Sequence, residues 1–323
     1  MKNYLDIMQN IISHGEWKET RTGIRCKTTF CETFRHDMAA GFPLLTTKKM
    51  GLKNISVELQ GFMHGITSKK WYQDRKCRIW DEWANPIEVE KALEHAKWDC
   101  AEMGGPPSPH ETEQNIKKQL KLQVQKECDD LGPVYGYQWR NFGAQYGKLN
   151  GHTSGYEWNS TPNGMEHGFD QFQFIVDTLK TNPLDRRMVC SAWNPNQSDM
   201  MALPPCHLLW NVVVIGNKLN LCWFQRSNDF FLGNPYNIAS YGMLLLLLAK
   251  ESGLQPGILH GTFSDCHIYE NHIAQVEEQL SREPFRLPNV EITGDQSIFD
   301  WTYENFNLEN YMSHDSIKAK VAV

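Results

Sequence analysis

A predicted β-hairpin in the second half of the chain carries the residues with the most evident chemistry. The apolar runs His207–Ile215 and Lys218–Gln225 flank Gly216-Asn217, a dipeptide that suits a two-residue primed turn. Such a turn sets the register of the two strands, so the facing residues can be counted back from it. The count leads to the open end of the hairpin, where reactive and polar side chains replace the apolar ones.

At this open end we expect a thiol beside a guanidinium and a hydroxyl. The count places His207 opposite Arg226 and Cys206 opposite Ser227. The thiolate is the nucleophilic form of cysteine, and a fixed positive charge nearby lowers the pKa of a thiol. We therefore predict that Cys206 is a nucleophile, with a buried structural cysteine as the alternative.

Helical patterns indicate the elements that position these residues. The first sixteen residues predict an amphipathic helix. A second helix begins at Asn234-Pro235 by cap and first-turn preferences and ends at Gly253; because it is apolar nearly all round, we expect it to be buried. Glu58 stands in the largely apolar helical stretch NISVELQGF. A buried acid is costly unless it is partnered, which favours a functional role for Glu58.

Residues 86–129 differ from the rest of the chain, since they are charged and poor in aromatic residues. A Gly-Gly-Pro-Pro-Ser-Pro break separates two helical patterns, Glu88–Met103 and Glu111–Leu131. We interpret this segment as a helical surface insertion in a single domain that spans residues 1–323.

The composition is that of an ordinary globular protein. The 323 residues are 41% hydrophobic and 22% charged, enough for one large domain or two. The net charge of -6 argues against a surface that coats nucleic acid, although a local basic pocket remains open. Nine cysteines without a CxxC motif indicate reduced thiols in a cytoplasmic protein. No signal-peptide core is visible, and the longest apolar run, Met243–Ala249, is too short to span a bilayer.

Short motifs in a fixed order cover almost the whole chain outside residues 86–129. They are RTG at 21–23, FPLLTTKK at 42–49, IWDEWA at 79–84, DLGPVYG at 130–136, DRRMVCSAWNPNQSDMMALPPCH at 185–207, QRSNDFFLGNPYNIASY at 225–241, DCHIYENHIAQVEEQLSREP at 265–284 and IKAKVAV at the end. On these motifs the chain resembles the thymidylate synthase family. The resemblance implies an α/β (α+β) fold with a large mixed β-sheet flanked by helices, and two such sheets packed face to face across a homodimer.

The activity implied by the resemblance is the methylation of dUMP to dTMP with 5,10-methylenetetrahydrofolate as co-substrate. Cys206 would attack C6 of uracil and so turn C5 into a carbon nucleophile, because C5 is otherwise poorly reactive. Arg226 would lie beside the thiol, and Glu58, Tyr135 and His207 would line a water network that moves protons at C5 and O4. Without its neighbour Cys206, a histidine such as His207 would more often be a satisfied core residue.

The resemblance also implies a phosphate site built from arginines, whose planar forks suit phosphate oxygens. Arg21, Arg226 and Ser227 would come from one chain, and Arg186 and Arg187 would reach over from the partner. In isolation an Arg-Arg pair more often marks a solvated surface. The shared site would make the homodimer obligatory for activity.

Asn237 is the residue that we expect to select the base. A carboxamide donates and accepts, so it can match the O4 acceptor and the N3–H donor of uracil together. Cytosine presents an amino donor and a bare ring nitrogen, and an Asp at this position would favour it. Without the resemblance, an Asn two residues after Pro235 could instead cap a helix.

His267 and Tyr269 match the residues that hold the deoxyribose 3′-hydroxyl in the family. The Cys266-His267 pair has no second pair at ligand spacing, so we expect no metal site.

Folate contacts are implied for three kinds of group: aromatic rings for stacking, a carboxylate for the pterin N–H donors, and amines for the glutamate tail. The residues at these positions are Trp80 and Trp83, Asp229, and Lys48 and Lys53, together with Tyr236 and Val323.

Several residues depart from the family pattern, and they leave alternatives open. The departures are Gly61 for Trp, Ser264 and Arg25 for Gly, Asn234 for Leu, Tyr236 for Phe, Asn228 for Cys and Lys320 for Pro. A site that excludes water favours hydride transfer and dTMP, whereas water addition would give 5-hydroxymethyl-dUMP and tetrahydrofolate. A non-catalytic nucleotide- or RNA-binding homologue is a third alternative, which the intact Cys206 and Glu58 and the acidic balance argue against.

Overall fold

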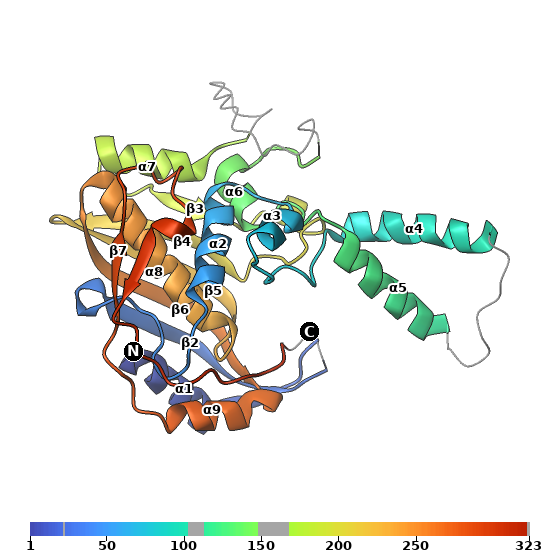
Figure 1. Ribbon diagram of the computed structural model, residues 1–323, viewed down its shortest axis with the longest axis horizontal. Coiled ribbons are helices and arrows are strands. Elements are labelled where there is room, and N and C mark those ends of the chain that lie inside the picture. The colour runs from blue at the N-terminus through green and yellow to red at the C-terminus, as the bar shows by residue number, and fades with distance from the viewer. Residues whose placement is uncertain (22, 103–112, 148–167, 322–323) are drawn as a thin grey trace. The chain divides into compact units, whose positions relative to one another are not determined.

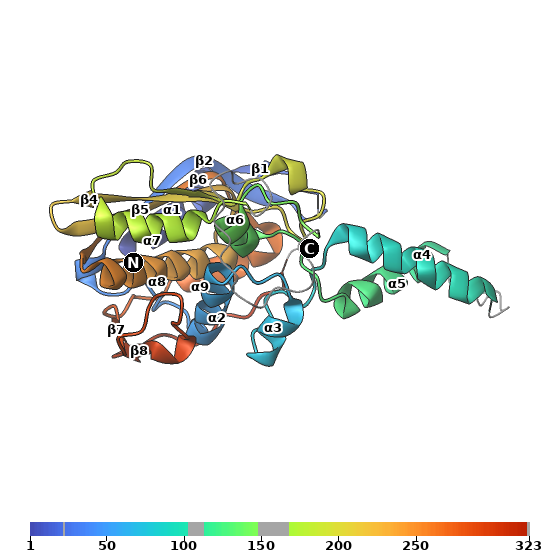
Figure 2. The same cartoon turned by 90° about the horizontal axis from the view of Figure 1, so that it is seen from above.

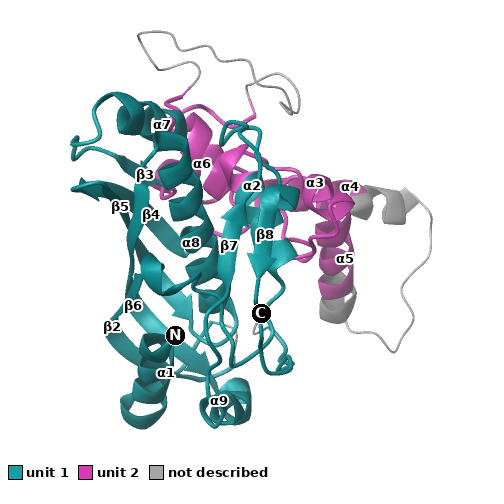
Figure 3. Cartoon of the chain, turned by 60° about the vertical axis from the view of Figure 1, so that its left-hand side comes forward, with its two compact units in different colours: residues 1–60, 172–191, 206–323 teal, residues 61–171, 192–205 magenta. Residues whose placement is uncertain are grey.

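The computed structural model describes residues 1–21, 23–102, 113–147 and 168–321 (Figure 1). The chain divides into two compact units (Figure 3). The first unit comprises residues 1–60, 172–191 and 206–323, and the second comprises residues 61–171 and 192–205. The single domain with an insertion stays a prediction.

The first unit contains a six-stranded mixed sheet. Its strand order is β1 (Glu16–Lys18), β2 (Cys26–Asp37), β6 (Gln255–Tyr269), β5 (Lys218–Asp229), β4 (His207–Ile215) and β3 (Val189–Ser191). β5 and β6 run parallel, and the other neighbouring strands run antiparallel. This arrangement confirms the expected mixed sheet flanked by helices.

Helices and a small hairpin complete the first unit. They are α1 (Lys2–His14), most of α2 (Leu52–Met63) and of α7 (Gln171–Thr181), α8 (Gly233–Ser252), α9 (Ile273–Leu280), β7 (Asn289–Ile292) and β8 (Phe306–Glu309). α1 is amphipathic as predicted, since Tyr4, Ile7, Met8 and Ile11 are buried along one stripe.

α8 is the buried central helix that the sequence predicted. It lies along one face of the sheet against β5 and β6 (Figure 2). Gly253 ends it in the left-handed conformation with a φ of 68°, which glycine adopts without steric cost. The predicted start is one residue late, because the helix begins at Gly233 after Leu232. Asn234 is not its cap: the Asn234 side chain is buried, and neither polar atom has a hydrogen-bond partner among the described residues.

The two faces of the sheet differ in burial. On β4, Trp210, Val212 and Val214 lie on the buried face. The alternate residues Val213 and Ile215 are 38% and 69% exposed. Because successive strand residues point to opposite faces, the face of β4 turned away from the buried side carries exposed aliphatic side chains.

The second unit contains an aromatic cluster centred on Phe62. The Phe62 ring stacks on Tyr135 with centroids 4.9 Å apart, and Trp139 and Trp80 meet it edge-on at 5.7 Å and 6.5 Å. The helices of this unit are α3 (Lys69–Asp74), α4 (Pro86–Glu102), α5 (Glu113–Glu127) and α6 (Tyr135–Asn141). The cluster is the apolar core around which α6 packs.

α4 and α5 form the helix pair expected within residues 86–129. They run side by side, and the Lys121 ammonium lies 3.8 Å from the Glu90 carboxylate. The predicted second helix extended too far, because residues 128–131 are not helical. Asp129 instead accepts hydrogen bonds from Ser68 Oγ and the backbone N–H of Lys70. The Gly/Pro break at 104–109 lies outside the described residues.

No helix in the described part of the chain is long and apolar enough to cross a membrane.

Candidate active site

The β4–β5 hairpin forms as predicted, but its open end is shifted by one residue. Ile215 pairs with Lys218, and Gly216 takes a positive φ of 63° in the turn. A bulge between His207 and Leu209 changes the register, so His207 pairs with Gln225 and not with Arg226.

Cys206 consequently lies opposite Arg226 and not opposite Ser227. The backbone N–H of Arg226 donates to the carbonyl of Cys206 at 2.9 Å. Cys206 and Arg226 are both half-buried. The observed register therefore makes Cys206 and Arg226 neighbours across the two strands, and a guanidinium close to a thiol lowers the pKa of the thiol.

His207, the first residue of β4, is buried. Its Nδ1 lies 2.8 Å from the hydroxyl of Tyr241 on α8. Burial lowers the pKa of His207 to about 3, because an imidazolium cannot be solvated there. His207 is therefore neutral at physiological pH.

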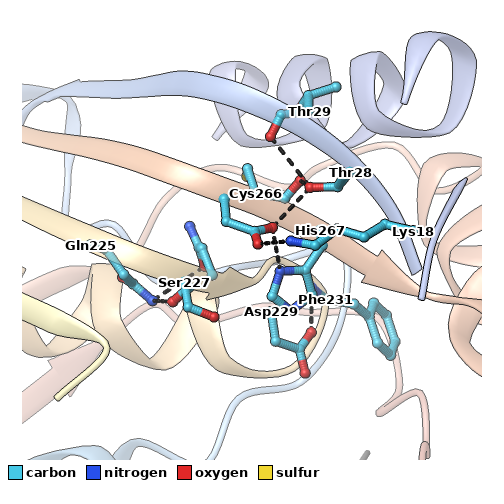
Figure 4. Close-up of polar contacts among 11 residues, drawn as sticks. Lys18, Thr28, Thr29, Gln225, Ser227, Asp229, Phe231, Cys266 and His267 are labelled. Atoms are coloured by element: carbon cyan, nitrogen blue, oxygen red, sulfur yellow. Dashed lines mark hydrogen bonds and ion pairs between the residues drawn. The ribbon is translucent and has the colours of Figure 1, made fainter. Parts of the chain in front are cut away.

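A carboxylate on β6 holds His267 in place. Asp265 Oδ1 lies 3.1 Å from His267 Nδ1 and accepts a hydrogen bond from Thr28 Oγ at 2.8 Å. Asp265 also forms an ion pair with Lys18; in Figure 4, Lys18 and Thr28 approach this group from the N-terminal strands. Hydrogen bonds from His267, Lys18 and Thr28 hold the pKa of Asp265 well below its ordinary value. The sequence reasoning missed Asp265, although its position two residues before His267 puts both on one face of the strand.

Tyr269 and Asp229 lie close to this group. Parallel pairing places Asp229 of β5 beside His267 of β6. Burial raises the pKa of Tyr269 to about 12, and the nearby Asp229 carboxylate, Cys26 and Cys206 add to the effect. Asp229 Oδ1 accepts the backbone N–H groups of residues 231 and 232 at 3.2 Å and 3.0 Å, just before α8.

Asn237 is half-buried in the first two turns of α8. Its Oδ1 accepts a hydrogen bond from Gln225 Nε2 at 3.2 Å. The helix has Leu232 as its N-cap, so the alternative that Asn237 caps a helix is wrong.

The two lysines expected at the folate glutamate tail contact aromatic rings. Lys48 is buried, donates to the carbonyl of Phe231 and lies 3.8 Å from the centroid of the Phe231 ring. Burial lowers the pKa of Lys48 to about 7. Lys53 lies 4.8 Å above the ring of Tyr303.

The arginines do not all gather at Cys206 within one chain. The carbonyl of Met188 accepts from Val212 N at 3.2 Å, so Arg187 lies beside β4 about six residues beyond Cys206. At about 3.3 Å per strand residue, this separation is about 20 Å. Arg187 forms a two-point ion pair with Asp185 and lowers the pKa of Asp185 to about 2.

The remaining predicted residues have simpler placements. Arg21 and Arg186 are exposed, Glu58 is buried on α2, and Tyr236 is half-buried at the start of α8. Ser227 pairs with Asp265 across β5 and β6. Val323 lies outside the described residues.

In the second unit, Trp80 and Tyr135 are buried in the aromatic cluster, and Trp83 is half-buried. The indole N–H of Trp80 is buried and has no hydrogen-bond partner among the described residues. A buried donor of this kind fits a ligand acceptor.

Comparisons with known proteins agree with these observations. A family model described as thymidylate synthase matches residues 2–323. A curated thymidylate synthase from Mycoplasma pneumoniae is 38% identical over 323 residues, and the match covers the full length of both chains.

Proposed function

This chain belongs to the thymidylate synthase family and is a methyltransferase acting on dUMP, and we propose that Cys206 carries the reaction by attacking C6 of uracil. The observation that carries this proposal is the shifted register of the hairpin, which brings Cys206 opposite Arg226. A guanidinium close to a thiol favours the thiolate, and the thiolate is the attacking species.

The covalent step moves one electron pair through the base. The Cys206 sulfur bonds to C6, and the electrons of the C5–C6 bond shift towards C5 and O4, so that C5 becomes nucleophilic. Once C5 carries the one-carbon unit and has lost its proton, the bond between that carbon and its donor breaks. Hydride then adds to the carbon, and the displaced electron pair re-forms the C5–C6 double bond as the sulfur leaves. Glu58 and Tyr135 are proposed to hold the water that moves these protons, with neutral His207 as a hydrogen-bonding partner.

We propose that the nucleotide is held by groups on β5, on β6 and in the loop between β1 and β2. We assign the phosphate to Arg21, Arg226 and Ser227, and the 3′-hydroxyl to His267 and Tyr269. His267 has its Nδ1 engaged by a carboxylate, which leaves Nε2 to the ligand. This arrangement supports recognition of a deoxyribose hydroxyl, which can donate to a ring nitrogen.

We propose 5,10-methylenetetrahydrofolate as the co-substrate, because membership of the family implies it. Trp80 offers a buried N–H, and Asp229 has one carboxylate oxygen beyond the one that accepts two backbone N–H groups. When bound, the folate supplies the one-carbon unit and the hydride. Trp83, Tyr236, Lys48, Lys53 and Val323 are the further proposed contacts.

We propose a homodimer in which Arg186 and Arg187 complete the phosphate site of the partner. The separation of about 20 Å between Arg187 and Cys206 along β4 supports this assignment, because Arg187 does not reach the thiol of its own chain. The exposed aliphatic residues Val213 and Ile215 on the outer face of the sheet suit a partner sheet.

The proposal is tested by the fate of dUMP and by a covalent trap. Wild-type protein should convert dUMP to dTMP with one dihydrofolate per turnover, measured by mass spectrometry and absorbance. It should also form a covalent adduct with 5-fluoro-dUMP, and Cys206→Ala should form neither product nor adduct. Cys128→Ala, which removes another half-exposed thiol, is the matched control and should behave as wild type.

Two results would contradict the proposal. Turnover by purified Cys206→Ala protein would show that Cys206 is not the nucleophile. A product heavier than dTMP by one oxygen, without dihydrofolate, would assign the water-addition reaction instead.

A further inference from the structure

A chain of three hydrogen-bonding side chains leads from the core to Asn237. The indole Nε1 of Trp223 donates to Gln225 Oε1 at 3.3 Å, and Gln225 Nε2 donates to Asn237 Oδ1 at 3.2 Å. Trp223 and Gln225 lie two residues apart on β5 and so point to the same face. Their exposed fractions are 0% and 3%, so water does not compete for these groups.

The direction of donation along these hydrogen bonds is determined at both ends of the Gln225 amide. An indole N–H can only donate, so the Gln225 atom that it meets must be the carbonyl oxygen. The backbone carbonyl of Ser227 can only accept, so the atom 3.1 Å from it must be the amide nitrogen (Figure 4). Asn228 Oδ1 lies farther from the same nitrogen, at 3.4 Å, and the two amide hydrogens go to the nearer acceptors, the Ser227 carbonyl and Asn237 Oδ1. Gln225 therefore presents a donor to Asn237.

This polarity decides which way the Asn237 amide faces. A carboxamide has nearly the same shape when it is turned over, but its donor and acceptor exchange places. Turning Asn237 over would set its NH₂ against the NH₂ of Gln225, donor against donor. The observed orientation keeps Oδ1 towards Gln225 and determines where the Asn237 donor and acceptor are offered to a base.

The orientation of Asn237 matters because uracil and cytosine present donor and acceptor in opposite order to an amide. Uracil offers an N3–H donor beside the O4 acceptor, whereas cytosine offers a ring-nitrogen acceptor beside an amino donor. One orientation of the carboxamide matches uracil, and the turned-over orientation matches cytosine.

We propose that Trp223, acting through Gln225, is a positioning residue that makes Asn237 select uracil over cytosine. The inference deepens the proposed function and rests on it. The indole is itself held in place, because its ring stacks on Tyr241 with centroids 4.9 Å apart at 18° and packs against Phe263 at 5.6 Å. Because the Trp223 N–H is held in one place, it keeps the Gln225 carbonyl towards Trp223 and the Gln225 NH₂ towards Asn237.

The test compares the two bases in one assay. Initial rates of dihydrofolate formation give KM for dUMP, and dCMP as a competing ligand gives its Ki, so no turnover of dCMP is needed. Trp223→Phe keeps an aromatic ring and removes only the N–H donor. We expect the ratio of Ki(dCMP) to KM(dUMP) to fall by at most about tenfold, because the Ser227 carbonyl still holds the Gln225 amide after the Trp223 donor is lost.

A second variant reverses the polarity. Gln225→Glu still accepts from Trp223 but presents an oxygen to Asn237, which should turn the amide over. We expect the ratio to fall further than in Trp223→Phe, by about a hundredfold. Trp210→Phe, which removes the indole that pairs with Trp223 across β4 and β5, is the control and should leave the ratio unchanged. Because the ratio does not depend on the amount of active protein, partial unfolding of a variant does not disturb it.

An unchanged ratio in Trp223→Phe and Gln225→Glu would overturn the inference while leaving the dUMP reaction intact. Failure of wild-type protein to form dTMP would instead contradict the proposed function, so the two failures are distinguishable.

Discussion

The ionisation of His207 differs widely between the folded and unfolded chain. Burial lowers its pKa from 6.5 to about 3, so between these values an unfolded chain binds a proton that the folded chain does not. The contribution of neutral His207 to the free energy of unfolding is complete above pH 6.5 and is lost as pH falls towards 3. The free energy of unfolding should fall by at most about 1.4 kcal/mol per pH unit in this range from this group.

Urea unfolding of wild type and His207→Asn between pH 7.5 and 4.5 measures this effect. The variant should be less stable at neutral pH and should depend less steeply on pH. Parallel pH profiles for the two proteins would contradict the assignment.

Asp265 is predicted to act on substrate binding through His267. Asp265→Ala removes the acceptor that holds His267 Nδ1 and leaves Lys18 without this partner. Because His267 is the proposed contact of the 3′-hydroxyl, kcat/KM should fall by about tenfold for dUMP and little for its 3′-deoxy analogue. Steady-state kinetics with both nucleotides measure the ratio.

Thr28→Val, which removes one of the hydrogen bonds to the Asp265 carboxylate, should show a smaller change in the same direction. An equal loss for both nucleotides in Asp265→Ala would mean that Asp265 acts on folding and not on the hydroxyl.

At the scale of elements, the outer part of the α4–α5 pair is predicted to be dispensable for catalysis. Glu90 and Lys121 lie within ion-pair distance, so a short Gly-Ser loop can join Lys91 to Lys121. We expect a variant without residues 92–120 to keep kcat within about twofold, since no proposed site residue is removed.

The inner end of α5 should behave differently. The buried ammonium of Lys69 donates to the carbonyl of Gln125 at 2.7 Å, and burial lowers the pKa of Lys69. Extending the deletion through residue 127 removes this partner and should cost about 1–3 kcal/mol, the usual penalty for an unsatisfied buried group. Thermal unfolding of the two deletion variants, beside wild type, tests the distinction; equal melting temperatures would contradict it.

At the scale of the whole molecule, the shared site predicts complementation between inactive chains. In a hybrid of Cys206→Ala with the Arg186→Ala/Arg187→Ala double variant, one of the two sites has every wild-type residue. Random pairing makes half of the dimers hybrid, so about a quarter of wild-type activity should return after joint refolding. Cys206→Ala mixed with Glu58→Gln is the control: both residues come from one chain, so no site is restored. Recovery in the control, or none in the first mixture, would contradict the shared site.

The sequence alone determined much of this protein, because its strongest signals are local. Turn chemistry at Gly216-Asn217 predicted β4 with its observed bounds, and a pattern that is apolar nearly all round over residues 234–252 predicted a buried helix. Ordered motifs predicted the family that the full-length matches show. These signals depend on residues close together in the chain, where backbone preference and periodicity act directly.

Only the tertiary structure decided which groups meet. The bulge near His207 moved Arg226 opposite Cys206, and no turn rule predicts a bulge nine residues away. The Lys18–Asp265 contact joins residues 247 positions apart, and the Gln225–Asn237 hydrogen bond joins a strand to a helix. Such contacts depend on how strands are ordered and how α8 packs on them, and their directional hydrogen bonds are set only when that packing is complete.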